Sequence, residues 1–227
     1  MNERVTYRDK TVPWSVIINS VQRLGDVLVC VNCTMPTEVQ LSIGDTIAID
    51  VQPTSGVLRR YTVSSVSTSA FEFIAFRTQR GPATAFLDML SDGGHIHGQG
   101  PERPVKLPTG NQRYVVVLGD ETVVGTAVAV LSATASPVSL AIKTSLSIPD
   151  IPQLNGITTC ATCDNDDDMK QWLTDFVTQH GSENVEVFLV GEQSANQLLR
   201  QHAFSLGVSK ENLATRTFWR PDKAGLE

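Results

Sequence analysis

Two segments in the first half of the chain combine residue types that suit a planar ligand carrying a phosphate. The first is Arg59–Thr62, with the sequence R-R-Y-T. On a strand, Arg59 and Tyr61 share one face, so the guanidinium could hold a phosphate while the ring stacks on a planar group. The alternative is an edge strand with ordinary surface charges, and the tetrapeptide alone does not decide between the two.

The second segment is Gly81–Thr84, with the sequence G-P-A-T. Proline is favoured at the first position of a helix. The backbone N–H groups and the dipole of a helix start favour an anion, and Thr84 would add a hydroxyl. An ordinary capped helix without a ligand would have the same sequence, so this segment is also ambiguous alone.

Three later segments lie at the ends of expected strands. They are Gly119–Thr122 (G-D-E-T), Val190–Glu192 (V-G-E) and Phe218–Pro221 (F-W-R-P). Open α/β sheets bind ligands at the carboxyl ends of their strands, which is where the first two segments are expected. Asp120 and Glu121 would repel a pyrophosphate there and would instead suit a helix start. The third segment could place an aromatic ring and a cation in a cleft.

The first half of the chain predicts a β domain. Short segments rich in Val and Ile, bounded by Gly, Pro, Ser or Asp, favour a closed barrel or a sandwich. The expected strands are 14–20, 25–34, 45–51, 60–65, 70–77 and 95–99, with a helix over 84–90.

The second half predicts alternating strands and helices, which indicate an α/β domain with a parallel sheet. The expected strands are 114–118, 138–143, 156–162, 185–190 and 215–219, and the expected helices are 121–133, 167–180 and 193–206. Residues 100–104 and 107–110 have the composition of a linker. We therefore expect a six-stranded antiparallel β-barrel over residues 1–108, an α/β domain over 109–227, and a ligand cleft between them.

Composition limits the possible partners. The chain has 227 residues, of which 41% are hydrophobic, so it can bury a core. The 24 acidic against 18 basic residues give a net charge of −6, which argues against nucleic acid or an anionic membrane as the main partner. The longest apolar stretch, 123–133, is shorter than the ~20 residues of a membrane helix. Because no signal peptide is visible, we expect a cytoplasmic protein without membrane insertion.

Cysteine and histidine spacing gives weak support for a metal. Cys30 and Cys33 fall in an alternating, strand-like segment, where positions i and i+3 point to opposite faces. Together with Cys160 and Cys163, we interpret them as small buried hydrophobes, with zinc or a redox disulfide as the alternatives. His95-Ile96-His97 lacks an evident third ligand, so no metal site is predicted.

The joint order of the motifs resembles a known family. The chain runs R-x-Y-T, G-P-A-T, then G-x-G-P at Gly98–Pro101, G-D-E-T, V-G-E with Leu199-Arg200, and F-W-R. Over 28–223, this order is similar to that of the siderophore-interacting proteins, which are FAD-dependent ferric-siderophore reductases of the ferredoxin-reductase-like superfamily.

The resemblance implies a cofactor site on the first two motifs. Arg59 would contact the FAD pyrophosphate, Tyr61 would pack against the isoalloxazine, and Thr62 would hydrogen-bond near its N5 atom. Val63 would complete this stretch. The pyrophosphate would be received at the helix start by Gly81, Ala83 and Thr84.

The resemblance also implies roles for the later motifs. Asp120 and Thr122 would lie at the flavin edge. A nicotinamide would meet Glu121, Gly191 and Glu192. The substrate entrance would be flanked by Trp219, Arg220 and Lys223. An anionic ferric siderophore would be steered by a cationic lip, for which the candidates are Arg220, Lys223, Arg216 and Arg103.

The expected function is therefore FAD-dependent reduction of a ferric siderophore, with NADPH or NADH as the donor. One alternative is an FAD- and siderophore-binding protein without turnover. Another is a flavin reductase that serves a different acceptor or a partner redox protein. Three departures from the family pattern bear on this: Ser64 replaces an arginine, Arg77 replaces a histidine, and the segment after Thr122 is V-V-G without the proline.

Overall fold

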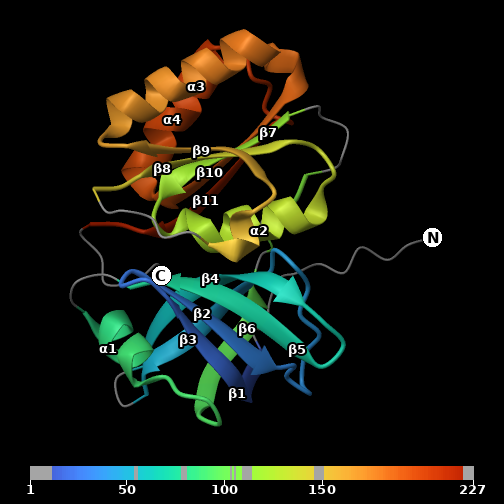
Figure 1. The fold of residues 1–227 in the computed structure, drawn as a ribbon, viewed down its shortest axis with the longest axis vertical. Helices are drawn as coiled ribbons and strands as arrows, with labels where there is room; N and C mark the ends of the chain where they lie inside the picture. Colours follow the sequence, from blue (N-terminus) through green and yellow to red (C-terminus); the bar gives the residue numbers. More distant parts are fainter. Residues whose placement is uncertain are drawn as a thin grey trace.

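The protein consists of a β-barrel and a parallel sheet, with one helix packed between them (Figure 1). The computed structural model describes residues 12–53, 56–77, 81–102, 104, 106–108, 114–145 and 151–221. Both parts of the predicted architecture are confirmed. The proposed division at residue 108 falls between the last barrel strand and the first strand of the sheet.

The barrel contains six antiparallel strands in the closed order β1-β2-β5-β4-β3-β6. Their bounds are β1 Val12–Leu24, β2 Leu28–Thr34, β3 Thr46–Gln52, β4 Val57–Val66, β5 Ala70–Phe76 and β6 His95–Glu102. Inward-facing residues fill the interior with aromatic and branched side chains, among them Trp14, Phe71 and Phe73. The short helix α1, Pro82–Met89, adds Phe86 and Leu87 to this core.

The linker prediction was wrong for residues 100–102. These residues belong to β6, where Gly100 pairs with Val12 of β1 and Glu102 pairs with Thr46 of β3. Glycine and proline suggested a break, but strand pairing on both sides satisfies the backbone of this segment.

The second part is a five-stranded parallel sheet in the order β11-β10-β7-β8-β9. Its elements are β7 Tyr114–Asp120, α2 Val123–Ala133, β8 Val138–Lys143, β9 Ile157–Cys163, α3 Asp166–His180, β10 Val185–Glu192, α4 Gln193–Ser205 and β11 Leu213–Trp219, with short 3₁₀ turns at Pro152–Leu154 and Ser182–Asn184. The helices α3 and α4 cover the face of the sheet that points away from the barrel (Figure 1). Within the described ranges, no helix is long and apolar enough to cross a membrane.

Strand β7 is buried on both faces, as its continuous apolar run predicted. Val115 and Val117 belong to the cluster around α2, whereas Val116 and Leu118 belong to the cluster beneath α3 and α4. The period of two along a strand explains this division.

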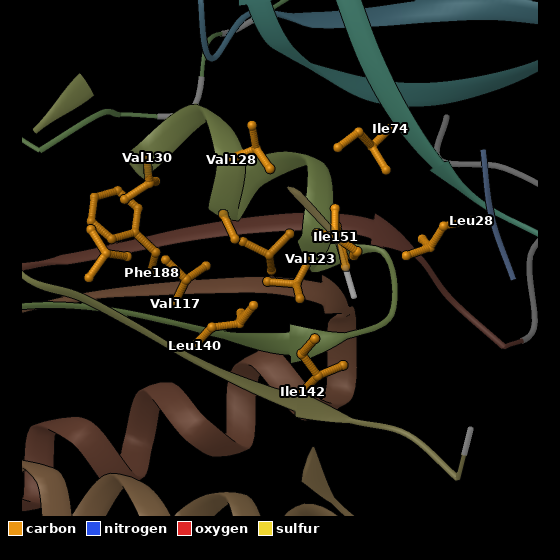
Figure 2. Packing of buried hydrophobic residues seen from close by; sticks show 14 of the residues in the cluster. Leu28, Ile74, Val117, Val123, Val128, Val130, Leu140, Ile142, Ile151 and Phe188 are labelled. Atoms are coloured by element: carbon orange, nitrogen blue, oxygen red, sulfur yellow. The ribbon is translucent and has the colours of Figure 1, made fainter. Parts of the chain in front are cut away.

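Helix α2 joins the two parts through a shared core. Its residues 123–130 are all buried. Figure 2 shows Leu28 and Ile74 of the barrel on one side of the helix, and Val117 and Phe188 of the sheet on the other. Such a continuous apolar layer holds the two halves of the cleft in a fixed relation.

Two contacts fix how closely α2 approaches the barrel. A Cβ atom on Gly125 would lie 3.1 Å from the carbonyl oxygen of Ile74, so glycine permits the close approach. The hydroxyls of Thr62 on β4 and Thr126 on α2 are hydrogen-bonded at 2.9 Å in buried surroundings.

We expect Thr62→Val to lower the free energy of unfolding by about 1–3 kcal/mol, because it leaves the Thr126 hydroxyl buried and unpaired. The double variant Thr62→Val/Thr126→Val should be more stable than either single variant, since it removes both polar groups together. Urea unfolding of the four proteins measures this. Additive losses would contradict a direct coupling of the two hydroxyls.

The cysteines lie in different environments. Cys30 faces the α2 cluster and Cys33 the barrel interior, on opposite faces as predicted. Burial raises the pKa of Cys33 to about 12. Burial, followed by the charge of Glu72, raises the pKa of Cys30. Cys163 is buried, but the expectation was wrong for Cys160, which is exposed on the edge strand β9.

Candidate functional site

A cleft of about 370 Å³ lies between the barrel and the parallel sheet, within the usual range of small-molecule sites. It is formed by β4, β5, the start of α1, the turn from β7 into α2, and the end of β11. Its lining residues are Arg59, Arg60, Tyr61, Thr62, Ile74, Phe76, Gly81, Pro82, Ala83, Asp120, Glu121, Thr122, Gly125, Phe218, Trp219 and Arg220.

Strand β4 contributes two neighbouring arginines whose environments differ. Arg60 is ion-paired with Glu102 of β6 at 2.7 Å, and Glu102 also lies 3.6 Å from Arg216 of β11. Among the described residues, no carboxylate pairs with Arg59, whose Nη1 donates to the carbonyl oxygen of Leu58 at 2.8 Å. Arg59 is therefore the arginine better placed to bind a phosphate.

Tyr61 presents a ring and a neutral phenol to the cleft. Its ring lies 5.0 Å from that of Phe73, at an interplanar angle of 36°. Burial raises the pKa of Tyr61, and the charge of Arg59 opposes that rise. The phenol is thus a hydrogen-bond donor at neutral pH.

The start of α1 faces the cleft through small residues. Gly81 has φ of 129° and precedes Pro82, the first residue of the helix. A Cβ atom on Gly81 would meet nothing within 4 Å, so the backbone here borders open space. First-turn N–H groups lack partners inside their own helix, which suits an anion.

The far wall of the cleft comes from the end of β11. Phe218, Trp219 and Arg220 all line it. The side chain of Trp219 is 38% exposed. The buried Nε of Arg220 has no hydrogen-bond partner among the described residues, and an unpaired buried guanidinium N–H fits an anionic ligand.

Most of the predicted site residues meet in this cleft. From the first half of the chain these are Arg59, Tyr61, Thr62, Gly81 and Ala83, and from the second half Asp120, Glu121, Thr122, Trp219 and Arg220. They come from segments far apart in the sequence, which the packing of α2 against the barrel brings together.

Four predicted residues lie elsewhere. Val63 is fully buried in the barrel core, on the face of β4 that it shares with Tyr61, whose ring also packs against that core. Thr84 is buried and does not line the cleft. Gly191 and Glu192 do not line the cleft but contact Asp120, which does. Lys223 lies outside the described residues, as does Arg103 of the expected cationic lip.

Several lining residues were missed by the sequence analysis. Ile74 and Phe76 share one face of β5, and their alternation was a usable signal once β5 was placed beside β4. Gly125 could also have been predicted from the sequence, since an isolated glycine in an apolar helix often marks close packing. Pro82 and Phe218 stood inside the quoted motifs, but without an assigned role.

Two other candidates do not contribute to the cleft. Arg77 is ion-paired with Asp88 at 2.6 Å, and this contact lowers the pKa of Asp88. His95 and His97 are exposed on β6. The described part of the chain contains no group of three His, Cys, Asp or Glu residues that could hold a metal ion.

The cleft suits a flavin in its donor set and shape. Aromatic and branched side chains offer flat apolar surface, Arg59 offers a cation for a phosphate, and Gly81 leaves the helix start open. The residues present therefore fit a flavin such as FAD.

By sequence, no protein-family profile and no curated protein matches the chain. Among solved structures, a siderophore-interacting protein from Acinetobacter baumannii has a TM-score of 0.72 at 19% identity, covering 95% of this chain and 92% of that one. A siderophore utilization protein from T. fusca has a TM-score of 0.73 at 14% identity, with 96% and 97% covered. The ferredoxin reductase of carbazole 1,9a-dioxygenase has a TM-score of 0.75 at 15% identity, with 93% and 69% covered. The chain therefore has the fold that siderophore-interacting proteins and ferredoxin reductases share, as its motifs predicted.

Proposed function

We propose that this protein is a flavin-dependent reductase that binds FAD in the cleft and reduces a ferric siderophore with a pyridine nucleotide. The observation that carries the proposal is the convergence of Arg59, Tyr61 and Thr62 with the start of α1 and the Trp219-Arg220 wall. The similar folds of a siderophore-interacting protein and a ferredoxin reductase support the same class.

The residues of the cleft would divide the work of binding. Arg59 and the first turn of α1 would hold the pyrophosphate, because both supply N–H donors with positive charge. Tyr61 would pack on one side of the ring system. Thr62 lines the cleft, and with Thr126 as the donor in their shared hydrogen bond, the Thr62 hydroxyl proton would be left for a ligand.

A bound flavin would supply the conversion between a two-electron hydride donor and a one-electron ferric acceptor. Reduction to Fe(II) weakens binding by hard oxygen donors, so the metal can leave the siderophore. The chain's own contribution would be to bind, orient and enclose the reacting groups. As expected from the sequence, we place this activity in the cytoplasm.

The carboxyl edge of the sheet favours NADH over NADPH as the donor. Lys143, at the end of β8, is already ion-paired with Asp166 at 2.6 Å and lies 3.9 Å from Glu192. The first turn of α3 adds Asp167 and Asp168. Carboxylates at such an edge accept hydrogen bonds from a ribose 2′-hydroxyl, whereas they repel a 2′-phosphate.

The test is the visible spectrum of the purified protein after incubation with FAD and removal of the excess. Anaerobic NADH should bleach the flavin, NADPH should do so less effectively, and a ferric siderophore should restore the colour while a ferrous chelator captures iron. Bleaching that only a partner redox protein reverses would instead indicate a ferredoxin-reductase-like role. Bound flavin that neither nucleotide bleaches would indicate a binding protein without turnover. A protein that binds no flavin would overturn the proposal.

We expect Arg220→Glu to raise the KM for an anionic ferric siderophore by about tenfold, because a cation that steers the substrate becomes an anion. Steady-state kinetics at fixed NADH measure this, with the flavin content determined for each protein. Arg200→Glu is the matched charge reversal, since Arg200 lies over the Phe204 ring on α4, away from the cleft. Equal KM values for the two variants would exclude Arg220 from substrate binding.

A further inference from the structure

The indole of Trp219 is anchored by a residue on a different strand. Its Nε1 donates a hydrogen bond to Oδ2 of Asp120 at 2.8 Å, across 99 positions of sequence. The pairing of β10 with β11 shifts register here, from Gly191 opposite Thr217 to Glu192 opposite Trp219. A bulge of this kind re-aims side chains next to a site.

The Asp120 carboxylate is occupied by protein donors. Oδ1 accepts from the backbone N–H of Thr122 at 2.9 Å and from the Thr122 hydroxyl. Oδ2 accepts from the backbone N–H of Glu192 at 2.9 Å and from Trp219. A carboxylate offers about four acceptor positions, so these contacts leave no room for a direct hydrogen bond to a ligand.

Gly191 completes this arrangement by leaving space for the carboxylate. It has φ of 119°, and a Cβ atom at this position would lie 2.4 Å from Oδ2 of Asp120. The side chain of Asp120 itself is buried. The ends of β7, β10 and β11 are thus tied together at one carboxylate.

We propose that Asp120 is a positioning residue that fixes the indole of Trp219 as a wall of the cleft. Its effect on a ligand is indirect and passes through Trp219. The part of this proposal that concerns a planar ligand rests on the proposed FAD site, whereas the anchoring of the indole does not.

Indole N–H signals in a ¹H–¹⁵N spectrum of the protein without flavin test the anchor. The chain has 3 tryptophans, and loss of one signal in Trp219→Phe assigns it. In Asp120→Ala, the Trp219 signal should move upfield and its proton should exchange faster with solvent, while the signals of Trp14 and Trp172 stay in place and report an intact fold. Thr122→Val is the matched control: it removes one donor to Asp120, and the Trp219 signal should stay where it is.

The wild-type protein provides a measurement that no folding failure can affect. Although the Trp219 side chain is 38% exposed, its indole proton should exchange at least tenfold more slowly than that of free indole. Free exchange in the wild type, or an unmoved Trp219 signal in Asp120→Ala, would overturn the proposal.

FAD titration tests the indirect effect. Asp120→Ala and Trp219→Ala should each weaken FAD binding by about three- to tenfold, as expected for a lost aromatic contact. The double variant should be no weaker than the single variants. Multiplying losses would show that Asp120 acts on the ligand independently and would overturn the indirect role. Absence of FAD binding in the wild type would refute the proposed function but leave the indole measurements standing.

Discussion

Replacing Arg59 by alanine is expected to weaken FAD binding by about 100-fold. A guanidinium on a pyrophosphate makes charge-assisted hydrogen bonds, each worth about 1.5–3 kcal/mol, and every 1.4 kcal/mol is tenfold in affinity. Arg59 is the arginine of β4 that faces the cleft without a carboxylate partner among the described residues. Equilibrium titration of the FAD-free protein, followed by flavin fluorescence, measures the effect.

Two further variants sharpen this experiment. Arg59→Lys keeps the charge but loses the planar fork, so its affinity should fall between those of the wild type and Arg59→Ala. Arg77→Ala removes an arginine that is ion-paired with Asp88, and it should bind FAD as the wild type does. If Arg59→Ala kept its affinity, or if Arg77→Ala lost it equally, the assignment of the phosphate to Arg59 would be wrong.

Replacing Gly119 by alanine is expected to cost about 4 kcal/mol or more in the free energy of unfolding. The added Cβ would lie 2.0 Å from the carbonyl oxygen of Val190. Gly119 and Val190 face each other in the paired strands β7 and β10, so the clash is with backbone in the middle of the sheet. Such a contact is relieved only by moving a strand, which places the change among the most destabilising classes. Urea unfolding measures it.

Gly56→Ala is the matched control. Gly56, unlike Gly119, has a positive φ, of 66°, and a Cβ atom there would meet nothing within 4 Å. Its replacement should cost only the strain of the left-handed conformation, about 1–2 kcal/mol. Similar losses at both positions would mean that the clash at Gly119 is relieved by a small shift, and that the sheet is more adaptable than its packing suggests.

The Gly119 prediction also bears on the site. Gly119 directly precedes Asp120, whose carboxylate ties the ends of β7, β10 and β11. A displaced β7 would therefore also release Trp219. If Gly119→Ala still folds, the indole N–H signal of its Trp219 should change in the same way as in Asp120→Ala.

The sequence by itself determined the type and order of the elements. Alternation along the strands and the 3.6-residue period of the helices report burial, which local composition already encodes. Strand β7 is an example, because its unbroken apolar run requires cover on both faces. The same local reasoning placed Cys30 and Cys33 on opposite faces of β2.

The motifs also identified most of the cleft before its geometry was known. Their chemistry and their order along the chain were enough to predict a ligand site at Arg59, Tyr61, Gly81, Trp219 and their neighbours. Their meeting in one cleft depends on the packing of α2 against β4 and β5, and the glycine at position 125 permits this close approach.

Only the tertiary structure decided which partner each charged side chain has. Arg60 and Arg59 are adjacent in sequence, but Glu102 reaches one of them and not the other. Asp120 lines the cleft as expected, but only the structure shows that its carboxylate accepts hydrogen bonds from donors on two other strands. The physical reason is that burial follows a local period, whereas a hydrogen bond depends on strand order and register, which bring together residues as far apart as Asp120 and Trp219.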